Sequence, residues 1–358
     1  MKNNTKLGIK LDHLYRMTDS VGILEHSVMA TPDLREGYCV DDNARALRVA
    51  LRLGEEKLTD TYLKFLVAGA GEKEFKNDLS QNLVWENGGN GENFGRAMAA
   101  LADTAKLGLR DDQKLAGMFI FDQYVKYIEK VEQVRSKAWL IYGLLVRDQS
   151  DPKFKPVLQN YIQVKVSQKK IVKMSKFDFK KIAKRLAEEL ITSYGKNSGT
   201  KWKWFEDKIT YDVGRLPWAL FWAYSELGDT RYLNIARESL DFLLEQIYDK
   251  KLDCFSFPGY RGWFNKNGDK AVFGQQPIEA GSVVEVCAQA FSVTKEKKYL
   301  DWAKKALDWY YGKNILGTMM IDQYTGGVYD GLEEKGVNLN EGAESLLSYL
   351  FARLCFED

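Results

Sequence analysis

The chain has 358 residues, of which 45% are hydrophobic, 28% are charged and 13% are aromatic. This length is enough for one large domain or two ordinary ones, and the composition is that of a globular protein. The formal net charge of +2 excludes the strong charge bias of proteins that bind polyanions, so we expect no nucleic-acid partner.

The N-terminal sequence MKNNTKLGIKLDHLYR lacks the apolar segment of a signal peptide. No run of about 18 apolar residues occurs, so the sequence predicts no membrane span. The four cysteines are far apart and form no C-x-x-C motif, which is typical of a reducing compartment. We therefore expect a cytoplasmic protein.

Two kinds of predicted helix alternate along the chain. Helices that are apolar on nearly every face, and therefore buried on all sides, begin near residues 42, 93, 136, 213, 279 and 341. Amphipathic helices follow near residues 58, 112, 152, 231 and 296, and a helix near 7–17 can partner the last buried one. The alternation predicts an inner and an outer ring of helices. We expect an all-α, (α/α)6 toroid formed by residues 1–358 as a single domain.

The segment near 150–200 fits this pattern least well. Between Lys165 and Arg185 it carries nine basic residues and a single acid, Asp178. We interpret it as a Lys-rich irregular or inserted segment with a solvated surface, and a contact with an anion or polymer is the alternative.

A loop rich in carboxylates and amides precedes most inner helices. Five of these loops read GYCVDDNARAL, ENGGNGENFGRAM, WFEDKITYDVGRLPWAL, FGQQPIEAGSVV and GVNLNEGAESLL. In an α/α toroid these helix ends converge on one face, so the sequence predicts one polar site there. The candidate catalytic acids are Asp42, Glu92, Asp207, Asp212, Glu279 and Glu341.

Each of these acids has a structural alternative as a helix cap or a first-turn charge. Asp41 and Asp42 are adjacent, which exceeds what one cap requires. The only histidines are His13 and His26, and the motifs of zinc proteases and serine hydrolases are absent. The last loop lacks the EF-hand spacing, so we predict no metal and no cofactor. Catalysis would then depend on carboxylates, as in glycoside hydrolysis, where one carboxyl protonates the leaving oxygen and another activates water.

Residues suited to binding a sugar lie in the same loops. Amides both donate and accept hydrogen bonds, so they suit hydroxyl groups, and aromatic rings can stack on sugars or simply pack a core. Arg215 has the alternative role of pairing with Asp212 or Asp207. The candidate substrate-binding residues are Asp41, Asn43, Glu86, Trp204, Glu206, Tyr211, Arg215, Arg261, Trp263, Gln275, Gln276, Asp330, Asn338 and Asn340.

The Gly-rich sequence WENGGNGENFG superficially resembles a phosphate-binding turn. Phe94 occupies the place of the third glycine and no strand is predicted before the loop. A nucleotide-binding fold is therefore excluded.

The chain resembles a family of cytoplasmic six-hairpin glycosidase-like proteins of bacteria and archaea, often described only as glycosidase-like or linked to glycosyltransferases. The matching sequences cover nearly the whole chain: HLYRMTDSVGILEHS, GYCVDDNARAL, WFEDKITYDVGRLP, GYRGW, GQQPIEA and TGGVYDGL…GVNLNEGAES. The resemblance implies an (α/α)6 toroid and glycan processing, and some members neighbour mannoside phosphorylases. Phe94 departs from the histidine expected in relatives. If that histidine contacts substrate, the departure implies altered specificity or weakened activity.

The leading hypothesis is an intracellular glycoside hydrolase acting on a short oligosaccharide such as a mannoside. Glu279 would be the general acid and Asp42 the base or nucleophile, and three aromatic side chains would stack the sugar: Trp204, Tyr211 and Trp263. One rival is a non-catalytic glycan-binding partner of a glycosyltransferase. Another is a different toroid enzyme, a phosphorylase or an epimerase. The epimerase ranks low because that class usually needs histidine as acid and base. The expected partners are an oligosaccharide and a glycosyltransferase or mannoside-processing enzyme.

Overall fold

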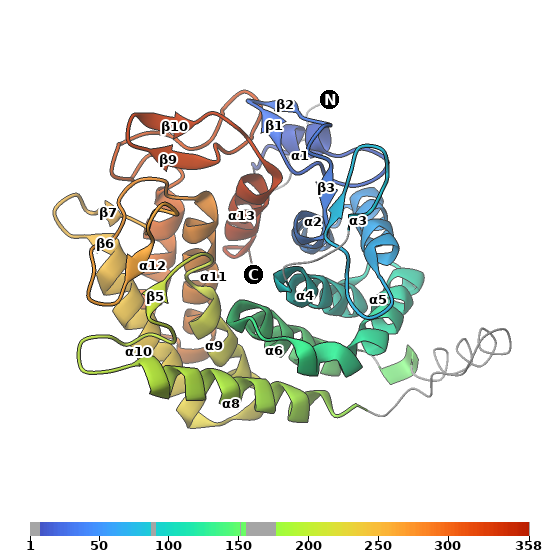
Figure 1. The fold of residues 1–358 in the computed structure, drawn as a ribbon, viewed down its shortest axis with the longest axis horizontal. Coiled ribbons are helices and arrows are strands. Elements are labelled where there is room, and N and C mark those ends of the chain that lie inside the picture. The colour runs from blue at the N-terminus through green and yellow to red at the C-terminus, as the bar shows by residue number, and fades with distance from the viewer. Residues whose placement is uncertain (1–7, 87–90, 151, 155–176, 358) are drawn as a thin grey trace, which may run out of the picture.

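The computed structural model describes residues 8–86, 91–150, 152–154 and 177–357, and its helices form a ring (Figure 1). The inner ring consists of α2 (Val40–Leu53), α4 (Glu92–Leu107), α6 (Val134–Asp148), α9 (Arg215–Leu227), α11 (Pro277–Thr294) and α13 (Ala343–Leu354). Each inner helix packs against the next one along the chain, and α13 packs against α2. The inner ring is therefore closed.

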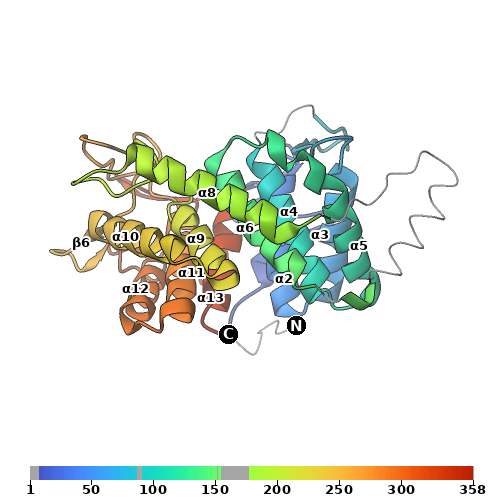
Figure 2. The same ribbon diagram turned by 90° about the horizontal axis from the view of Figure 1, so that it is seen from below.

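A second helix covers the outside of each inner helix. The outer helices are α3 (Glu56–Gly69) on α2, α5 (Asp111–Tyr124) on α4, α8 (Phe179–Asn197) on α6, α10 (Thr230–Ile247) on α9, α12 (Lys297–Asp308) on α11 and α1 (Asp12–Met17) on α13. Figure 2 shows α8 and α10 crossing the outer wall of the ring. Two short 3-10 helices, η1 (Val125–Lys130) and η2 (Pro152–Phe154), follow α5 and α6. The predicted all-α, (α/α)6 toroid is confirmed.

The two kinds of helix differ in burial as the apolar patterns indicate. In α11 every residue from Pro277 to Cys287 is buried, because neighbours surround an inner helix on all sides. In α10 the buried residues fall on one stripe that includes Tyr232, Ala236 and Leu240. Glycines in the left-handed conformation end two inner helices, Gly54 after α2 and Gly228 after α9, where a side chain would be strained.

The segment near 150–200 contains a regular helix. Helix α8 begins after Asp178, whose side chain caps it by accepting a hydrogen bond from the Lys181 N–H at 3.0 Å. Its buried residues recur at helical spacing and include Ala183, Leu186 and Leu190, and the basic residues between them, Lys184 and Arg185, are exposed. Residues 155–176 of this segment lie outside the described residues, as do residues 87–90 of the Gly-rich loop.

Short antiparallel strand pairs occur in the loops between the helices. The pairs are β1 (Ser27–Val28) with β2 (Thr31–Pro32), β3 (Tyr38–Cys39) with β4 (Asp78–Leu79), β5 (Lys208–Ile209) with β8 (Phe264–Asn265), β6 (Tyr248–Asp249) with β7 (Cys254–Phe255), and β9 (Gly331–Glu333) with β10 (Gly336–Asn338). In β3 and β4, Tyr38 pairs with Leu79 and Cys39 with Asp78. This pair leads directly into α2 and so fixes the start of an inner helix.

Close packing of α4 on α6 depends on Gly95. A Cβ atom at this position would lie 2.6 Å from the Ser136 carbonyl oxygen, so Gly95→Ala is expected to cost about 1–3 kcal/mol of stability through overpacking. Gly195 in α8 is the matched control, because its Cβ would meet nothing within 4 Å. Gly195→Ala is expected to stabilise by about 0.5–1 kcal/mol. Denaturant unfolding of both variants tests this, and equal shifts would contradict it.

Cys39, Cys254 and Cys287 are buried thiols that form no disulfide. Within the described ranges, every helix is either too short or too polar to cross a bilayer.

Candidate active site at the start of the inner helices

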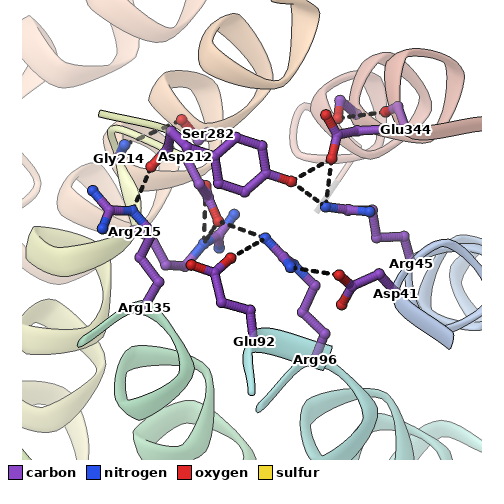
Figure 3. Close-up of polar contacts among 12 residues, drawn as sticks. Asp41, Arg45, Glu92, Arg96, Arg135, Asp212, Gly214, Arg215, Ser282 and Glu344 are labelled. Atoms are coloured by element: carbon purple, nitrogen blue, oxygen red, sulfur yellow. Dashed lines mark hydrogen bonds and ion pairs between the residues drawn. The ribbon is translucent and has the colours of Figure 1, made fainter. Parts of the chain in front are cut away.

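Arg45 connects three elements at the opening of the ring (Figure 3). From the first turns of α2, its Nη1 donates to Asp42 Oδ1 at 2.7 Å, and its Nη2 donates to Glu344 Oε2 at 2.7 Å and to the Tyr211 hydroxyl at 2.5 Å. The Tyr211 hydroxyl also donates to Glu344 Oε2. Because Glu344 lies on α13 and Tyr211 precedes α9, this cluster joins opposite parts of the ring.

Arg96 on α4 holds a second group of carboxylates, which Figure 3 shows beside the first. Its Nη1 lies 3.1 Å from Asp41 Oδ2, and its Nη2 lies 3.4 Å from Glu92 Oε2 and 4.0 Å from Asp212 Oδ2. The guanidinium also covers the Tyr211 ring at 5.3 Å from the centroid. Arg96 therefore brings carboxylates from the starts of α2 and α4 and from the turn before α9 to one guanidinium.

A strained turn precedes α9 at the base of the site. Asp212 has a φ of 54°, which is uncommon for a residue other than glycine. Glu279 holds this turn, because its two oxygens accept the Asp212 N–H at 3.2 Å and the Val213 N–H at 2.9 Å. Ser282 accepts the Gly214 N–H at 3.1 Å. Glu279 is fully buried, so it lies beneath the turn and not at the opening.

The charged states of these two buried carboxyls differ. Burial alone would raise the pKa of Asp212, but Arg215 and Arg96 outweigh it and hold that pKa below its usual range. Burial raises the pKa of Glu279 well above its usual range, and the hydrogen bond from Val213 opposes it only in part. The base of the site therefore combines an ionised aspartate with a glutamate that favours its neutral form.

Arg215 fixes Asp212 from below. Its Nε donates to Asp212 Oδ2 at 3.0 Å, and its two terminal nitrogens donate to Glu285 at 3.0 and 3.2 Å. The guanidinium stacks on Trp139 at 3.7 Å from the centroid, and Arg48 covers the same ring at 4.6 Å. A cavity of about 30 Å³ remains among these side chains, which is room for about one water molecule.

Several predicted site residues instead bind the backbone or pack in the core around the site. Asn43 accepts the Ile23 N–H at 3.0 Å, and Gln275 accepts the Phe257 N–H at 3.0 Å. Trp204 is fully buried against Phe205, so its ring is not presented to a ligand.

The acids near the start of α13 differ from one another in burial and in their contacts. Glu341 is buried, where it accepts from Thr325 Oγ1 at 2.9 Å, and its backbone oxygen lies 2.8 Å from His13 Nε2. Burial raises the pKa of Glu341 to about 7. Asp330 accepts from the Gly342 N–H at 2.9 Å and from Asn340, so it shapes the start of α13. Glu344, one turn further on, faces the opening.

Other predicted residues lie at the periphery. Arg135 binds Glu206 at 3.0 Å, and Gln276 is the half-buried N-cap residue of α11. Trp263 is half-buried beside the exposed Arg261. The carboxylates of Asp207 and Glu86 and the amide of Asn338 are exposed. Phe94 is buried against Phe75 and Tyr124, so it belongs to an aromatic core.

Sequence reasoning missed Arg45 and Arg96, whereas the pairing of Arg215 with Asp212 was one of its alternatives. An acid followed three or four residues later by an arginine that contacts it recurs at the starts of three inner helices: Asp42 and Arg45, Glu92 and Arg96, Asp212 and Arg215. Side chains with this spacing lie on the same helix face. The recurrence could have identified Arg45 and Arg96.

Glu25 is a further acid that the sequence did not single out. Its carboxylate, the Cys39 thiol and the Asp42 carboxylate lie within 4.8 Å of one another. No other group of three such donors is this compact in the part of the chain that the structure describes. Asp42 is already bound by Arg45 and stands at the positive end of α2, which disfavours a cation, so we assign no metal to this group.

No protein-family model and no curated protein sequence matches this chain. Solved structures match over nearly the whole chain. A D-mannose isomerase has a TM-score of 0.66 at 12% identity, with 97% of this chain and 94% of that chain covered. A cellobiose 2-epimerase from Bacillus thermoamylovorans has a TM-score of 0.67 at 14% identity, with 99% and 96% covered. A GH76 α-mannanase from Bacteroides thetaiotaomicron has a TM-score of 0.55 at 9% identity, with 89% and 85% covered. The chain therefore has the toroidal fold of six-hairpin glycosidase-like enzymes, as the sequence resemblance implied.

Proposed function

We propose that this protein is a carbohydrate-processing enzyme that hydrolyses glycosidic bonds at the opening of the toroid. The observation that carries the proposal is the arrangement of Glu344. One of its oxygens accepts hydrogen bonds from Arg45 and Tyr211, while no contact occupies its other oxygen among the described residues. The side chain is 28% exposed. A carboxylate that is anchored on one side and open on the other suits a base that activates water.

The surroundings of Glu344 support this role. The Arg45 guanidinium stabilises the ionised carboxylate. Burial raises the pKa of Tyr211 well above its usual range, so its hydroxyl stays protonated and keeps donating to Glu344. In this proposal Glu344 takes the part that the sequence suggested for Asp42, because Asp42 is 3% exposed and lies behind Arg45. Tyr211 and Trp263 remain the proposed contacts for a sugar ring.

Epimerisation or isomerisation of a sugar is the second candidate function. It is favoured by the likeness in fold to a D-mannose isomerase, a sugar epimerase and a cellobiose 2-epimerase. Such reactions transfer a proton at the carbon next to a carbonyl group. The two histidines do not serve this opening directly, because His13 is buried beside Glu341 and His26 is exposed beside Glu25. Glu344 would then have to exchange the proton.

One experiment separates these functions. The purified protein is incubated with manno-, gluco- and galacto-oligosaccharides in D₂O, with and without phosphate, and the products are followed by mass spectrometry and NMR. We expect cleavage without phosphate. Turnover that requires phosphate would identify a phosphorylase, and deuterium at C2 of an uncleaved product would identify an epimerase. Binding without turnover would favour a glycan-binding partner of a glycosyltransferase. The absence of both binding and turnover would contradict a carbohydrate function.

A further inference from the structure

Trp263 differs from the other tryptophans in the contacts of its ring. Of the nine tryptophans, each of the others lies against a further aromatic ring. Within the described residues, the Trp263 ring meets no aromatic ring and no cation, and it does not pack against the hydrophobic core. Its side chain is half-buried. Part of this ring is therefore open to a ligand.

The backbone of Trp263 is held in a strained conformation. Its φ is 56°, which is an outlier for a bulky residue. Its N–H donates to the Gly259 carbonyl at 2.8 Å, and its carbonyl accepts the Ala271 N–H at 2.8 Å. A Cβ atom at Gly259 would lie 1.7 Å from the Phe273 carbonyl oxygen, so this hairpin is closely packed. Strain of this kind persists where the surrounding structure enforces it, and it clusters at ligand sites.

The strand pairing places Trp263 near the candidate active site. β8 begins at Phe264, directly after Trp263, and Phe264 pairs with Ile209 of β5. Tyr211 follows Ile209 by two residues, and Arg135 holds it by donating to its carbonyl. From the spacing of paired and consecutive residues, the Cα atoms of Trp263 and Tyr211 are at most about 17 Å apart. A short oligosaccharide can bridge such a span.

Tyr211 and Trp263 mark different positions along this span. One face of the Tyr211 ring is covered by Arg96, at 5.3 Å from the centroid, and its hydroxyl group donates to Glu344. Tyr211 thus belongs to the position where we propose the chemistry. Trp263 lies on another loop, where its ring is free of such contacts.

Polar and aromatic side chains next to Trp263 are exposed. Tyr260 is 42% exposed, and the Arg261 side chain is 67% exposed. Arg261 Nη2 lies 3.7 Å from Glu333 Oε2, which is beyond hydrogen-bond distance. A guanidinium has five N–H donors, so Arg261 keeps donors for the hydroxyl groups of a sugar.

We propose that Trp263 forms a second sugar subsite, separate from the position of Glu344, and that the site therefore selects oligosaccharides over monosaccharides. The inference rests on the proposed function, because it takes Glu344 as the position of the chemistry. The apolar face of a sugar ring stacks on the indole, and Arg261 binds its hydroxyl groups. Such remote binding is the same in the ground state and the transition state, so it lowers KM and leaves kcat unchanged.

Calorimetric titration with oligosaccharides of increasing length tests the subsite. The probes are mannose, mannobiose and mannotriose, and the corresponding glucose and galactose series. We expect the affinity of the wild type to rise with length. Trp263→Ala should weaken binding of the longest sugar about 10-fold and leave binding of the monosaccharide unchanged. Trp263→Tyr should restore most of the loss. Where the wild type cleaves the sugar, Trp263→Ala should raise KM by the same factor at constant kcat.

Thermal unfolding separates a binding role of Trp263 from a structural one. Trp263→Ala removes the ring but keeps the strained backbone, whereas Trp263→Gly removes both, because glycine adopts positive φ freely. The glycine variant should unfold about 1–3 °C above the alanine variant, with an equal loss of binding. Trp302→Ala is the matched control, since Trp302 is also half-buried but packs against Tyr248 and Phe255. It should lower Tm and leave binding unchanged.

The outcomes distinguish this inference from the proposed function. Full affinity for the longest sugar in Trp263→Ala, or equal losses for short and long sugars, would overturn the subsite and leave hydrolysis untouched. A loss of Tm in Trp263→Ala as large as that in Trp302→Ala would show a structural ring and would also overturn it. Binding that depends on Trp263 without any hydrolysis would support the subsite and contradict the hydrolase. A wild type that binds none of the sugars would overturn both.

Discussion

Replacing Glu344 with glutamine is expected to lower kcat by about 10³-fold on every substrate that the wild-type enzyme cleaves. Glutamine keeps the shape and can still accept hydrogen bonds from Arg45 and Tyr211, but it cannot take a proton from water. The loss should therefore be similar for oligosaccharides and for dinitrophenyl glycosides.

Circular dichroism and thermal unfolding should show that Glu344→Gln stays folded, because the side chain is partly exposed. Tyr211→Phe is a useful companion variant. It removes one of the two donors to Glu344 but leaves the Arg45 contact at 2.7 Å, so a smaller loss of about 10-fold is expected. Wild-type rates in folded Glu344→Gln would exclude Glu344 as the base and would contradict the proposed mechanism.

Arg215→Met is expected to destabilise the protein by about 3–5 kcal/mol. Methionine fills similar volume but leaves Asp212 and Glu285 without the cation that compensates both, and these residues are 1% and 9% exposed. The cation–π contact with Trp139 at 3.7 Å is lost as well. Denaturant unfolding measures the change. Arg231→Met is the control, because the ion pairs of Arg231 with Glu188 and Asp229 are at the surface and contribute little.

The loss in Arg215→Met should depend on pH. In the wild type the pKa of Asp212 lies below its usual range, so the stability that this group contributes is present above its unfolded pKa and is lost as pH falls through the folded pKa. Without Arg215 the carboxyl protonates at a higher pH and the buried charge disappears. The destabilisation should therefore be largest near about pH 7 and smaller near about pH 4. An equal loss at both pH values would mean that packing, not charge, dominates.

The toroid could be predicted from sequence because inner and outer helices carry different apolar patterns. The gathering of polar side chains near the starts of the inner helices was also predictable, since polar loops precede most of these helices. Which acid faces the opening was not predictable. Glu341 and Glu344 stand three residues apart before and within the first turn of α13, and only the packing of Thr325 and His13 around Glu341 decides that Glu344 is the open one.

Trp204 and Glu25 show two further features that could not be predicted from the sequence. An aromatic residue in a polar loop can belong to the core or to the rim, and the burial of Trp204 follows from contacts with distant residues. Glu25 lies in a loop without periodicity, so no helical or strand spacing relates it to Asp42. The spacing of Asp212 and Arg215, by contrast, leaves a local signal in the sequence.

The closure of α13 on α2 has a consequence for biogenesis. Arg45 and Glu344 are 299 residues apart in sequence yet share a hydrogen bond, and α1, near the start of the described chain, covers the last inner helix. During synthesis, the early hairpins can fold as they leave the ribosome, but the seam must wait for α13. Contacts of such long range close slowly. The contact between Arg45 and Glu344 in the candidate site should therefore form as the last event of folding, after the bulk of the helix content has formed.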